Sequence, residues 1–480
     1  MLFNSALFLF VFLPGAWAAY HLSWRKARNP ILLMASLVFY LWGGRDQALV
    51  LLLSIVINYL LGWLFLLPGQ SRKLVLILGI TLNLGLLVFY KYIGFLASNL
   101  NPILARLEFA PFAGSEIVAP LGISFFTFHA LSYLVDLYRG RAAPQLNPCK
   151  FALYLAVFPK ILAGPILKYQ DAEHQLGDRT VSPDSFLMGI RRFIIGLGKK
   201  TLIANPLAAV ADKIFAIPGH ELSPDVAWLG ILCYTLQIYF DFSGYTDMAV
   251  GLGKTFGFEF PENFNYPYIS QSVQEFWRRW HMSLSIWFRD YLYLPLGGNR
   301  CTRARHYRNL IVVFVLCGFW HGASWNFILW GLWYGLFLVL ERLEFGRVLR
   351  RAWRPLRHGY ALTVVVAGWV LFRAEDLSHA LHYYASLVGL NGPASGQYYL
   401  DLYVNSEVLL AFIIGMIAAM PAAAVLKNLT VGLPAYGTSW ARAAAWSFSL
   451  AHLLFLSSLF LLSCMAVAGG TYNPFIYFKF

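Results

Sequence analysis

The stretch Asn309–Leu340, NLIVVFVLCGFWHGASWNFILWGLWYGLFLVL, contains no Asp, Glu, Lys or Arg. A membrane-spanning helix needs about 20 apolar residues, so this stretch is longer than one span. Four glycines, Gly318, Gly322, Gly331 and Gly335, interrupt it. Irregular backbone is tolerated at membrane depth only where it contacts protein or lines a water-filled cavity. The stretch therefore predicts a broken or re-entrant pair of membrane helices.

The composition of the whole chain agrees with a membrane protein. Of its 480 residues, 59% are hydrophobic and only 12% are charged, about half the charged share of soluble domains. Further stretches without Asp, Glu, Lys or Arg are 47–71, 74–90, 226–240, 408–426 and 443–478. We expect an all-α, polytopic bundle of about ten to thirteen membrane helices, forming one domain over residues 1–480.

The charge balance and the cysteines exclude several other classes of protein. The chain has 37 Lys and Arg against 23 Asp and Glu, and the loops 278–308 and 341–357 are rich in arginine. Such loops fix cytoplasmic orientation and contact anionic membrane lipid, so we expect no nucleic-acid partner. The five cysteines are scattered singly, which predicts neither a metal site nor a disulfide framework. No phosphate loop, GxSxG elbow or dinucleotide fingerprint occurs.

The first candidate for chemistry is His321, in the motif CGFWHGASWN at 317–326. Ionisable groups at membrane depth are costly and usually line a cavity or a pathway. Imidazole is the side chain best suited to accept a proton near neutral pH, so His321 is a candidate general base. A buried structural histidine is the alternative. Ser324 and Asn326, beside small residues that allow close approach, are candidates for lining a substrate path.

The second candidate lies in EFWRRWHMSLSIWFRD, residues 275–290, where aromatic and basic residues alternate as in an amphipathic helix at the membrane interface. His281 shares the Trp-His dipeptide with His321. A catalytic zinc site requires three protein ligands, so a pair of histidines around one reaction centre is the better interpretation. Trp280 and Arg278 are further candidates for the substrate path.

Two more polar clusters interrupt apolar sequence. Asp241 and Asp247 lie in YFDFSGYTDM, where they could fix the tautomer of a catalytic histidine, pair with the arginines at 278–279, or join helices structurally. Asp241 is also a candidate for lining the substrate path. His129 and Asp136 are seven residues apart and so share a helix face. That face predicts either a polar stripe along a tunnel or a structural network.

Four motifs carry a family resemblance: FDFSGYTDMA at 240–249, FWRRWHMSLSIWFRDY at 276–291, YLPLGGNR at 293–300 and WHGASWN at 320–326. They resemble the membrane-bound O-acyltransferase family, in particular its branch concerned with bacterial alginate O-acetylation. The first residues, MLFNS, and the last, YNPFIYFKF at 472–480, resemble that branch as well. The resemblance therefore covers essentially the whole chain.

The resemblance implies a helical bundle around a funnel or tunnel, in the inner membrane of a bacterium. It further implies that His321 is the essential catalytic residue and that His281 lies near the reaction centre. The implied donor is acetyl-CoA on the cytoplasmic side, as a co-substrate rather than a bound cofactor. Periplasmic partner proteins would complete transfer to the polysaccharide. Other members acylate cellulose, peptidoglycan or teichoic acid, so the acceptor remains open.

These residues suit acyl transfer from a thioester to a hydroxyl. We expect His321 to be the general base, and His281 or a backbone N–H at 322–323 to face the developing oxyanion. An acyl-enzyme on Ser324 is an alternative. Arg278 is expected either to attract the phosphates of coenzyme A or to anchor lipid. The competing functions are a transporter or flippase, which would use the histidines as a proton relay, and a scaffold of a polysaccharide-modification complex.

Overall fold

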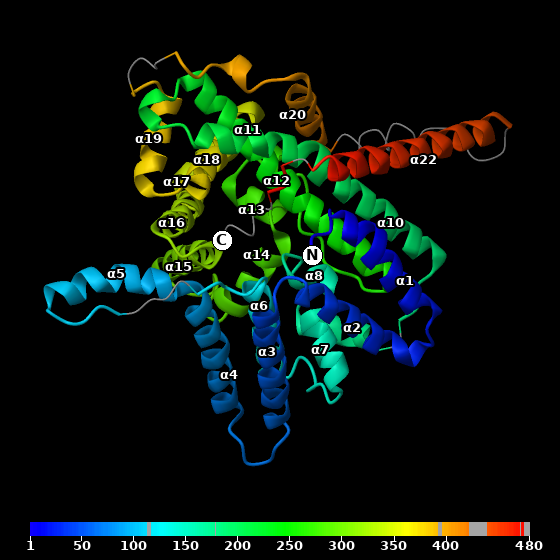
Figure 1. Cartoon of the computed structure of the whole chain (residues 1–480). Coiled ribbons are helices and arrows are strands. Elements are labelled where there is room, and N and C mark those ends of the chain that lie inside the picture. Colours follow the sequence, from blue (N-terminus) through cyan, green and yellow to red (C-terminus); the bar gives the residue numbers. More distant parts are fainter. Residues whose placement is uncertain (113–116, 178, 392–395, 422–438, 471, 475–480) are drawn as a thin grey trace.

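The structure of the chain is a computed structural model, which describes residues 1–112, 117–177, 179–391, 396–421, 439–470 and 472–474. Within these ranges the chain forms helices and loops and no strand (Figure 1). The all-α class predicted from the sequence is confirmed.

The N-terminal part contributes short and long helices that pack on one another, α2 against α7 and α4 against α6. Tyr20 in α1 donates to the backbone oxygen of Phe256 at 2.8 Å and so ties the N-terminal part to the centre of the molecule. In chain order the helices are α1 (Leu13–Leu22), α2 (Arg28–Leu41), α3 (Arg45–Leu64), α4 (Arg72–Leu87), α5 (Ile93–Arg106), α6 (Ile123–Tyr138), α7 (Pro148–Ala156), α8 (Phe158–Ile161) and α9 (Tyr169–Ala172).

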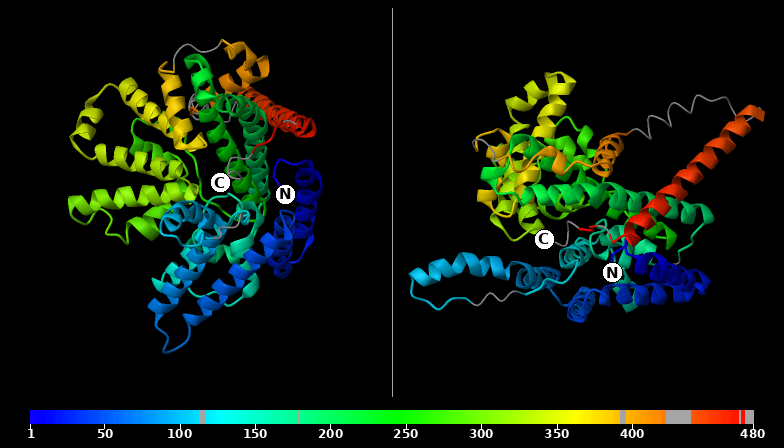
Figure 2. Two further views of the ribbon diagram at one scale, coloured as in Figure 1. Left: turned by 60° about the vertical axis from the view of Figure 1, so that its left-hand side comes forward. Right: turned by 45° about the horizontal axis from the view of Figure 1, so that its top comes forward.

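The remaining helices surround the long helix α12 and the two short helices that follow it (Figure 2). They are α10 (Pro183–Gly198), α11 (Asn205–Phe215), α12 (Pro224–Thr255), α13 (Val273–Arg279), α14 (Met282–Phe288), α15 (Arg303–His321), α16 (Trp325–Leu340), α17 (Glu344–Arg351), α18 (Arg354–Arg373), α19 (Leu377–Leu387), α20 (Ser406–Ala418) and α22 (Ser439–Ala468).

Helix α12 is the buried axis of the bundle. Its apolar window is 83% buried, whereas that of α22, which projects from the body in both figures, is 11% buried. Glycines let α10 approach α12 closely, because a Cβ added to Gly196 would lie 2.5 Å from the backbone oxygen of Gly244. Small residues at such crossings allow dense packing between membrane helices.

The described residues contain six helices that are long and apolar enough to cross a membrane, or seven if one bent pair counts as a single span. The expected number of ten to thirteen was therefore too high for this part of the chain. Several apolar stretches form helices shorter than a full span, such as Phe8–Leu22 and Ser406–Ala418.

Two of the long spans contain a π-helical turn. The first, η3 (Val88–Tyr92), joins α4 to α5 within the continuous helix 72–106. The second, η5 (Lys199–Ala204), joins α10 to α11 within 183–215. Each extra residue in such a turn changes which side chains face inward.

The break predicted within 309–340 is confirmed. Helix α15 ends at His321 and α16 begins at Trp325, and the two helices pack against each other. A Cβ on Gly318 would clash with the backbone oxygen of Phe327. The glycines therefore permit the close pairing, and the break leaves His321 at a buried helix end.

Candidate active site

His321 occupies the last position of α15 and is 5% exposed. Its imidazole lies among aromatic rings, with centroid distances of 4.8 Å to Trp320, 5.2 Å to Trp330 and 5.3 Å to Phe372. An apolar shell of this kind disfavours the charged imidazolium, because burial penalises charge. The neutral form, which a general base requires, is favoured.

His281 is fully buried and is held by a neighbouring asparagine. The backbone at His281 is left-handed, with φ of 43°, which turns the chain between α13 and α14. Its Nδ1 lies 3.3 Å from Oδ1 of Asn263. The same oxygen accepts from the backbone N–H of Ser283 at 3.1 Å and from its hydroxyl at 2.6 Å.

These contacts determine the tautomer of His281. A backbone N–H can only donate, so the Asn263 atom that receives it must be the amide oxygen. The nitrogen of His281 that faces this oxygen must therefore carry a hydrogen. In the neutral ring, Nε2 is then left with its lone pair. Within the described part of the chain, no hydrogen-bond partner of this Nε2 is found.

The rings of both histidines lie near the ring of Trp320. The ring of Trp320 is 6.5 Å from that of His281 and is next to His321. Phe242 of α12 lies 4.7 Å from His281, centroid to centroid, and also borders a small void of about 10 Å³ that His321 lines. The structure thus places the two motif histidines close to each other, although 40 residues separate them.

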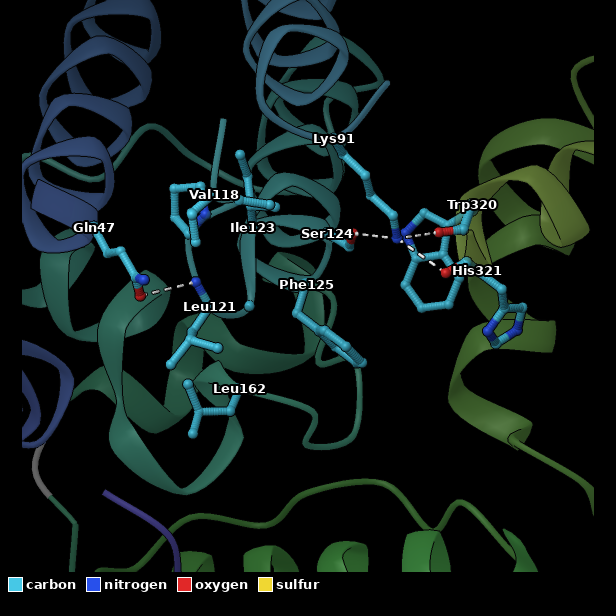
Figure 3. A pocket seen from close by; sticks show the side chains of 13 residues that line it. Gln47, Lys91, Val118, Leu121, Ile123, Ser124, Phe125, Leu162, Trp320 and His321 are labelled. Carbon is cyan, nitrogen blue, oxygen red and sulfur yellow. Dashed lines mark hydrogen bonds between the residues drawn. The ribbon is translucent and has the colours of Figure 1, made fainter. Parts of the chain in front are cut away.

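One cavity, of about 260 Å³, opens on the backbone side of His321, and we call it the Lys91 cavity (Figure 3). The backbone carbonyl of His321 faces Lys91, and the imidazole points away from it. Gln47 Oε1 accepts from the N–H of Leu121 at 3.4 Å on the far wall. The cavity is lined by Gln47, Lys91, 118–125, Leu162, Trp320 and His321.

A second cavity, of about 220 Å³, lies among α13–α16, and we call it the arginine cavity. It is lined by Arg278, Arg289 and Arg342, by polar side chains such as Ser285, and by apolar side chains such as Phe288. Cys317, one helical turn before His321, also lines it. Phosphate groups bind arginine clusters well, and an apolar wall suits a thioester chain.

One of these arginines has a carboxylate neighbour. The Arg289 Nε lies 2.8 Å from Asp290 Oδ1, and Lys168 lies 3.3 Å from the same carboxylate. Burial raises the pKa of Asp290, but the two cations outweigh it, so this pKa lies below its ordinary value. Among the described residues no ion pair of Arg278 is found, and its side chain is exposed. Arg278 therefore keeps its charge available to a ligand.

Three other residues that were predicted to line the substrate path differ in their surroundings. Trp280 is buried and lines the small void beside His321, as a path residue should. Asn326 is buried but donates to the backbone oxygen of Ala374 at 3.0 Å, which joins α16 to the end of α18. Ser324 precedes α16, is half-buried, and makes no side-chain cap of that helix.

The acidic residues of α12 are engaged in ion pairs. Asp241 lies 2.6 Å from Lys200, and both side chains are almost fully buried. Asp247 pairs with Arg192 and Lys199 at 2.6 Å and 2.7 Å. Of the alternatives considered for these carboxylates, the ion pairs favour the structural one, because they join α12 to α10 and to η5.

His129 and Asp136 belong to a structural network in α6. His129 Nε2 accepts from the backbone N–H of Leu167 at 3.3 Å, and Asp136 accepts from Tyr291 at 2.8 Å. These bonds support the structural alternative for this pair. Across the described ranges, no three His, Cys, Asp or Glu side chains are grouped so as to hold a metal ion.

With this geometry established, comparison with known proteins identifies the family. The family model of the membrane-bound O-acyltransferases matches residues 116–377. The chain belongs to the membrane-bound O-acyltransferase family. It is accordingly an O-acyltransferase and a multi-pass membrane protein. Both histidines lie within the matched region, as do most of the residues that line the two cavities. Lys91 precedes the matched region.

Three relatives of the chain are named for different acceptors. The chain is 40% identical over 502 residues to the probable alginate O-acetylase AlgI of Azotobacter vinelandii, which covers 100% of both chains. It is 38% identical to the peptidoglycan O-acetyltransferase of Helicobacter pylori, covering 82% of this chain and 80% of that protein. It is 28% identical to the teichoic acid D-alanyltransferase of Bacillus subtilis, covering 55% of this chain and 71% of that protein.

Two residues of this O-acyltransferase site were not found from the sequence. Lys91 is a single cation that follows the apolar stretch 74–90, and this isolation was a usable signal. Asn263 lies in an ordinary polar loop, PENFN, which gives no such signal. Its role depends on a contact with His281, 18 residues away.

Proposed function

We propose that this enzyme transfers an acetyl group from acetyl-CoA, on the cytoplasmic side of a bacterial inner membrane, toward an exported polysaccharide. The observation that carries the proposal is the position of His321. It is buried among aromatic rings beside the Lys91 cavity and one helical turn from Cys317, which lines the arginine cavity. The two cavities approach this residue from different sides, the Lys91 cavity along the His321 backbone and the arginine cavity at Cys317.

In the proposed reaction, the acceptor hydroxyl attacks the thioester carbonyl carbon while His321 removes the hydroxyl proton. Collapse of the tetrahedral intermediate forms the ester and breaks the C–S bond, and the thiolate leaves with the proton from His321. Neutral His281 has a lone pair at Nε2, so in this tautomer it accepts a hydrogen bond rather than donating to an oxyanion. The N–H of Gly322 already donates to the backbone oxygen of Gly318, so the backbone N–H of Ala323 is the proposed oxyanion donor.

The arginine cavity is the proposed entry for the donor. Arg278 and Arg342 would hold the phosphates of coenzyme A, and the apolar wall would take the pantetheine arm toward Cys317. Arg278→Ala should raise KM for acetyl-CoA and leave KM for acetyl-pantetheine, which lacks the nucleotide phosphates, unchanged. Equal effects on both donors would assign Arg278 to lipid anchoring or to structure instead.

Alginate is the proposed final acceptor polymer. The support is the extent of the similarity. A probable alginate O-acetylase matches the whole chain at 40% identity, whereas the peptidoglycan enzyme matches 82% of the chain. We propose that periplasmic acceptor or transferase proteins receive the acetyl group first. The test is to express the chain in an alginate producer that lacks its own O-acetylase and to measure acetyl esters on secreted alginate and on peptidoglycan separately.

The central test compares wild type with His321→Ala in lipid nanodiscs, following loss of the thioester from radiolabelled acetyl-CoA. A general base contributes about 10²–10⁴ in rate, so the variant should be nearly inactive. His220→Ala is the matched control, because the His220 side chain is 78% exposed, and it should retain full activity. Full activity of a well-folded His321→Ala protein would overturn the proposed mechanism.

The same assay separates the enzyme from the competing functions. A transporter or a scaffold would leave the thioester intact even when periplasmic partners are added. Family membership already favours the enzyme. Turnover by wild type that is lost in His321→Ala, with assembly of the complex preserved, would exclude both competitors.

A further inference from the structure

The C-terminal end of α15 has an unusual cap. The last carbonyls of a helix have no partner within the helix and need one from elsewhere. Here Gly318 accepts only a long bond of 3.4 Å from the N–H of Gly322. The next three carbonyls, at 319–321, all accept from two consecutive residues of another helix, Lys91 and Tyr92.

The distances are those of good hydrogen bonds. The ammonium of Lys91 lies 2.7 Å from the backbone oxygen of Trp320 and 3.1 Å from that of His321 (Figure 3). The Tyr92 hydroxyl lies 3.0 Å from the backbone oxygen of Phe319, and the two rings stack at 4.3 Å. We call Lys91 and Tyr92 together the α15 clamp.

The π-helical turn explains how two adjacent residues reach one target. In a regular α-helix, neighbouring side chains diverge by about 100° around the axis. The turn η3 ends at Tyr92 and widens the helix at this point. Lys91 and Tyr92 can then both face the end of α15, more than 220 residues later in the chain.

The donors of Lys91 are fully used in this arrangement. An ammonium has three N–H donors, and the third faces Ser124 Oγ at 3.4 Å. All three acceptors are neutral, and within the described ranges no ion pair of Lys91 is found. A cation at a helix C-terminus is stabilised by the partial negative charge of the unpaired carbonyls.

We propose that Lys91 is a positioning residue for the acyl-transfer reaction. By holding the carbonyls of Trp320 and His321, it fixes the backbone from which the His321 imidazole projects. Lys91 does not itself contact the reacting atoms, because its three donors are occupied by the protein. This inference rests on the proposed role of His321 as general base, and it adds a residue that the family motifs do not contain.

A structural residue alone would not need a charge here. A lysine within an apolar span costs free energy relative to an apolar side chain. Leucine or methionine at position 91 would avoid that cost but leave two carbonyls beside the break without a strong donor. The charge is therefore explained by the need to hold the end of α15 in one place.

The test uses the full-length enzyme in nanodiscs with acetyl-CoA, with Lys91→Met and Lys91→Ala. A misplacement of about 1 Å can cost about 10²-fold in rate, so we expect kcat to fall about 10- to 100-fold. KM for acetyl-CoA should change less than about twofold. Lys73→Met is the matched control, because Lys73 lies on the same continuous helix and is exposed, and it should behave as wild type.

Chemical rescue distinguishes positioning from a general loss of structure. Ethylammonium, added to purified Lys91→Ala, should enter the adjoining cavity of about 260 Å³ and restore much of kcat. Ethanol at the same concentration, which lacks the charge, should not. Unchanged kcat in Lys91→Met, or a raised KM with unchanged kcat, would overturn the proposal.

Hydrogen exchange gives an answer that does not depend on turnover. Amides at 319–326 should exchange faster in Lys91→Met than in wild type, whereas those of α12 should not change. Equal exchange at 319–326 would overturn the clamp even if activity fell. If wild type itself consumes no acetyl-CoA with its partners present, the proposed function has failed, and hydrogen exchange alone decides the role of Lys91.

Discussion

Two of the π-helical turns of this protein, η3 and η5, lie within long spans and place lysines in different surroundings. In η5, Lys199 and Lys200 face carboxylates of α12, Asp247 and Asp241. In η3, Lys91 faces only backbone carbonyls and a hydroxyl. A lysine that forms an ion pair with a carboxylate joins two helices through charge neutralisation. A lysine that donates hydrogen bonds to backbone carbonyls fixes the course of that backbone, and here the backbone carries His321.

The difference predicts which property each lysine controls. The side chains of Lys200 and Asp241 are 3% and 1% exposed, so removing either breaks a buried ion pair. Breaking such a pair is strongly destabilising. Removing Lys91 leaves no unpaired charge, only neutral carbonyls. Variants in η5 should therefore affect stability, and variants in η3 should affect rate.

The largest expected effect is that of Lys200→Met. Breaking the buried pair of Lys200 with Asp241 should lower the free energy of unfolding by about 3–5 kcal/mol, measured by thermal unfolding in detergent. The double variant Lys200→Met, Asp241→Leu should recover most of the loss, because both charges are then gone. If the single variant is as stable as wild type, the contrast between the two turns does not hold.

Asn263→Ala tests the same contrast, between contacts to a side chain and contacts to a backbone, at the two histidines. A side-chain contact holds His281, whereas backbone contacts hold His321. Loss of the amide oxygen frees the tautomer of His281 and leaves the N–H of Ser283 without its acceptor. We expect kcat to fall about 10- to 100-fold, as for other misplaced groups. The measurement is acetyl-CoA consumption, with Asn265→Ala in the same loop as the control. An unchanged kcat would remove His281 from the reaction.

Tyr92→Phe should have a smaller effect. The substitution removes one hydrogen bond to the carbonyl of Phe319 and keeps the stacked ring. A single neutral hydrogen bond contributes about 0.5–1.5 kcal/mol, so kcat should fall by no more than about tenfold. A loss as large as that of Lys91→Met would show that the tyrosine, rather than the charge, holds the end of α15.

The smallest expected effect is that of Lys199→Met. Lys199 is 24% exposed, and Asp247 keeps its second partner, Arg192, when Lys199 is removed. Partly exposed ion pairs contribute about 0–1 kcal/mol, so the unfolding temperature should fall only slightly. A decrease comparable to that of Lys200→Met would mean that burial does not separate the two lysines.

Local sequence was sufficient to predict much of the site but not its supports. A break within 309–340 followed from glycines in an overlong apolar stretch, although its position did not, and the two Trp-His dipeptides indicated the paired histidines. Lys91 and Asn263 were not predicted, because the residues that they contact lie far away in the chain or carry no sequence signal that points to them. Asp241 was recognised as significant, but its role was left open between a histidine, the arginines at 278–279 and the joining of helices, since the packing of α12 against η5 determines which way it points.

Because the clamp lies at 91–92, the matched family region 116–377 does not carry everything that places His321. A transplant of that region into a relative would move both histidines but leave the backbone support of His321 behind. The recipient would have to supply its own lysine and π-turn in register with the new helix end. The reactive part of this enzyme is therefore not a self-sufficient module, and successful chimeras should be those whose junction falls before Val88.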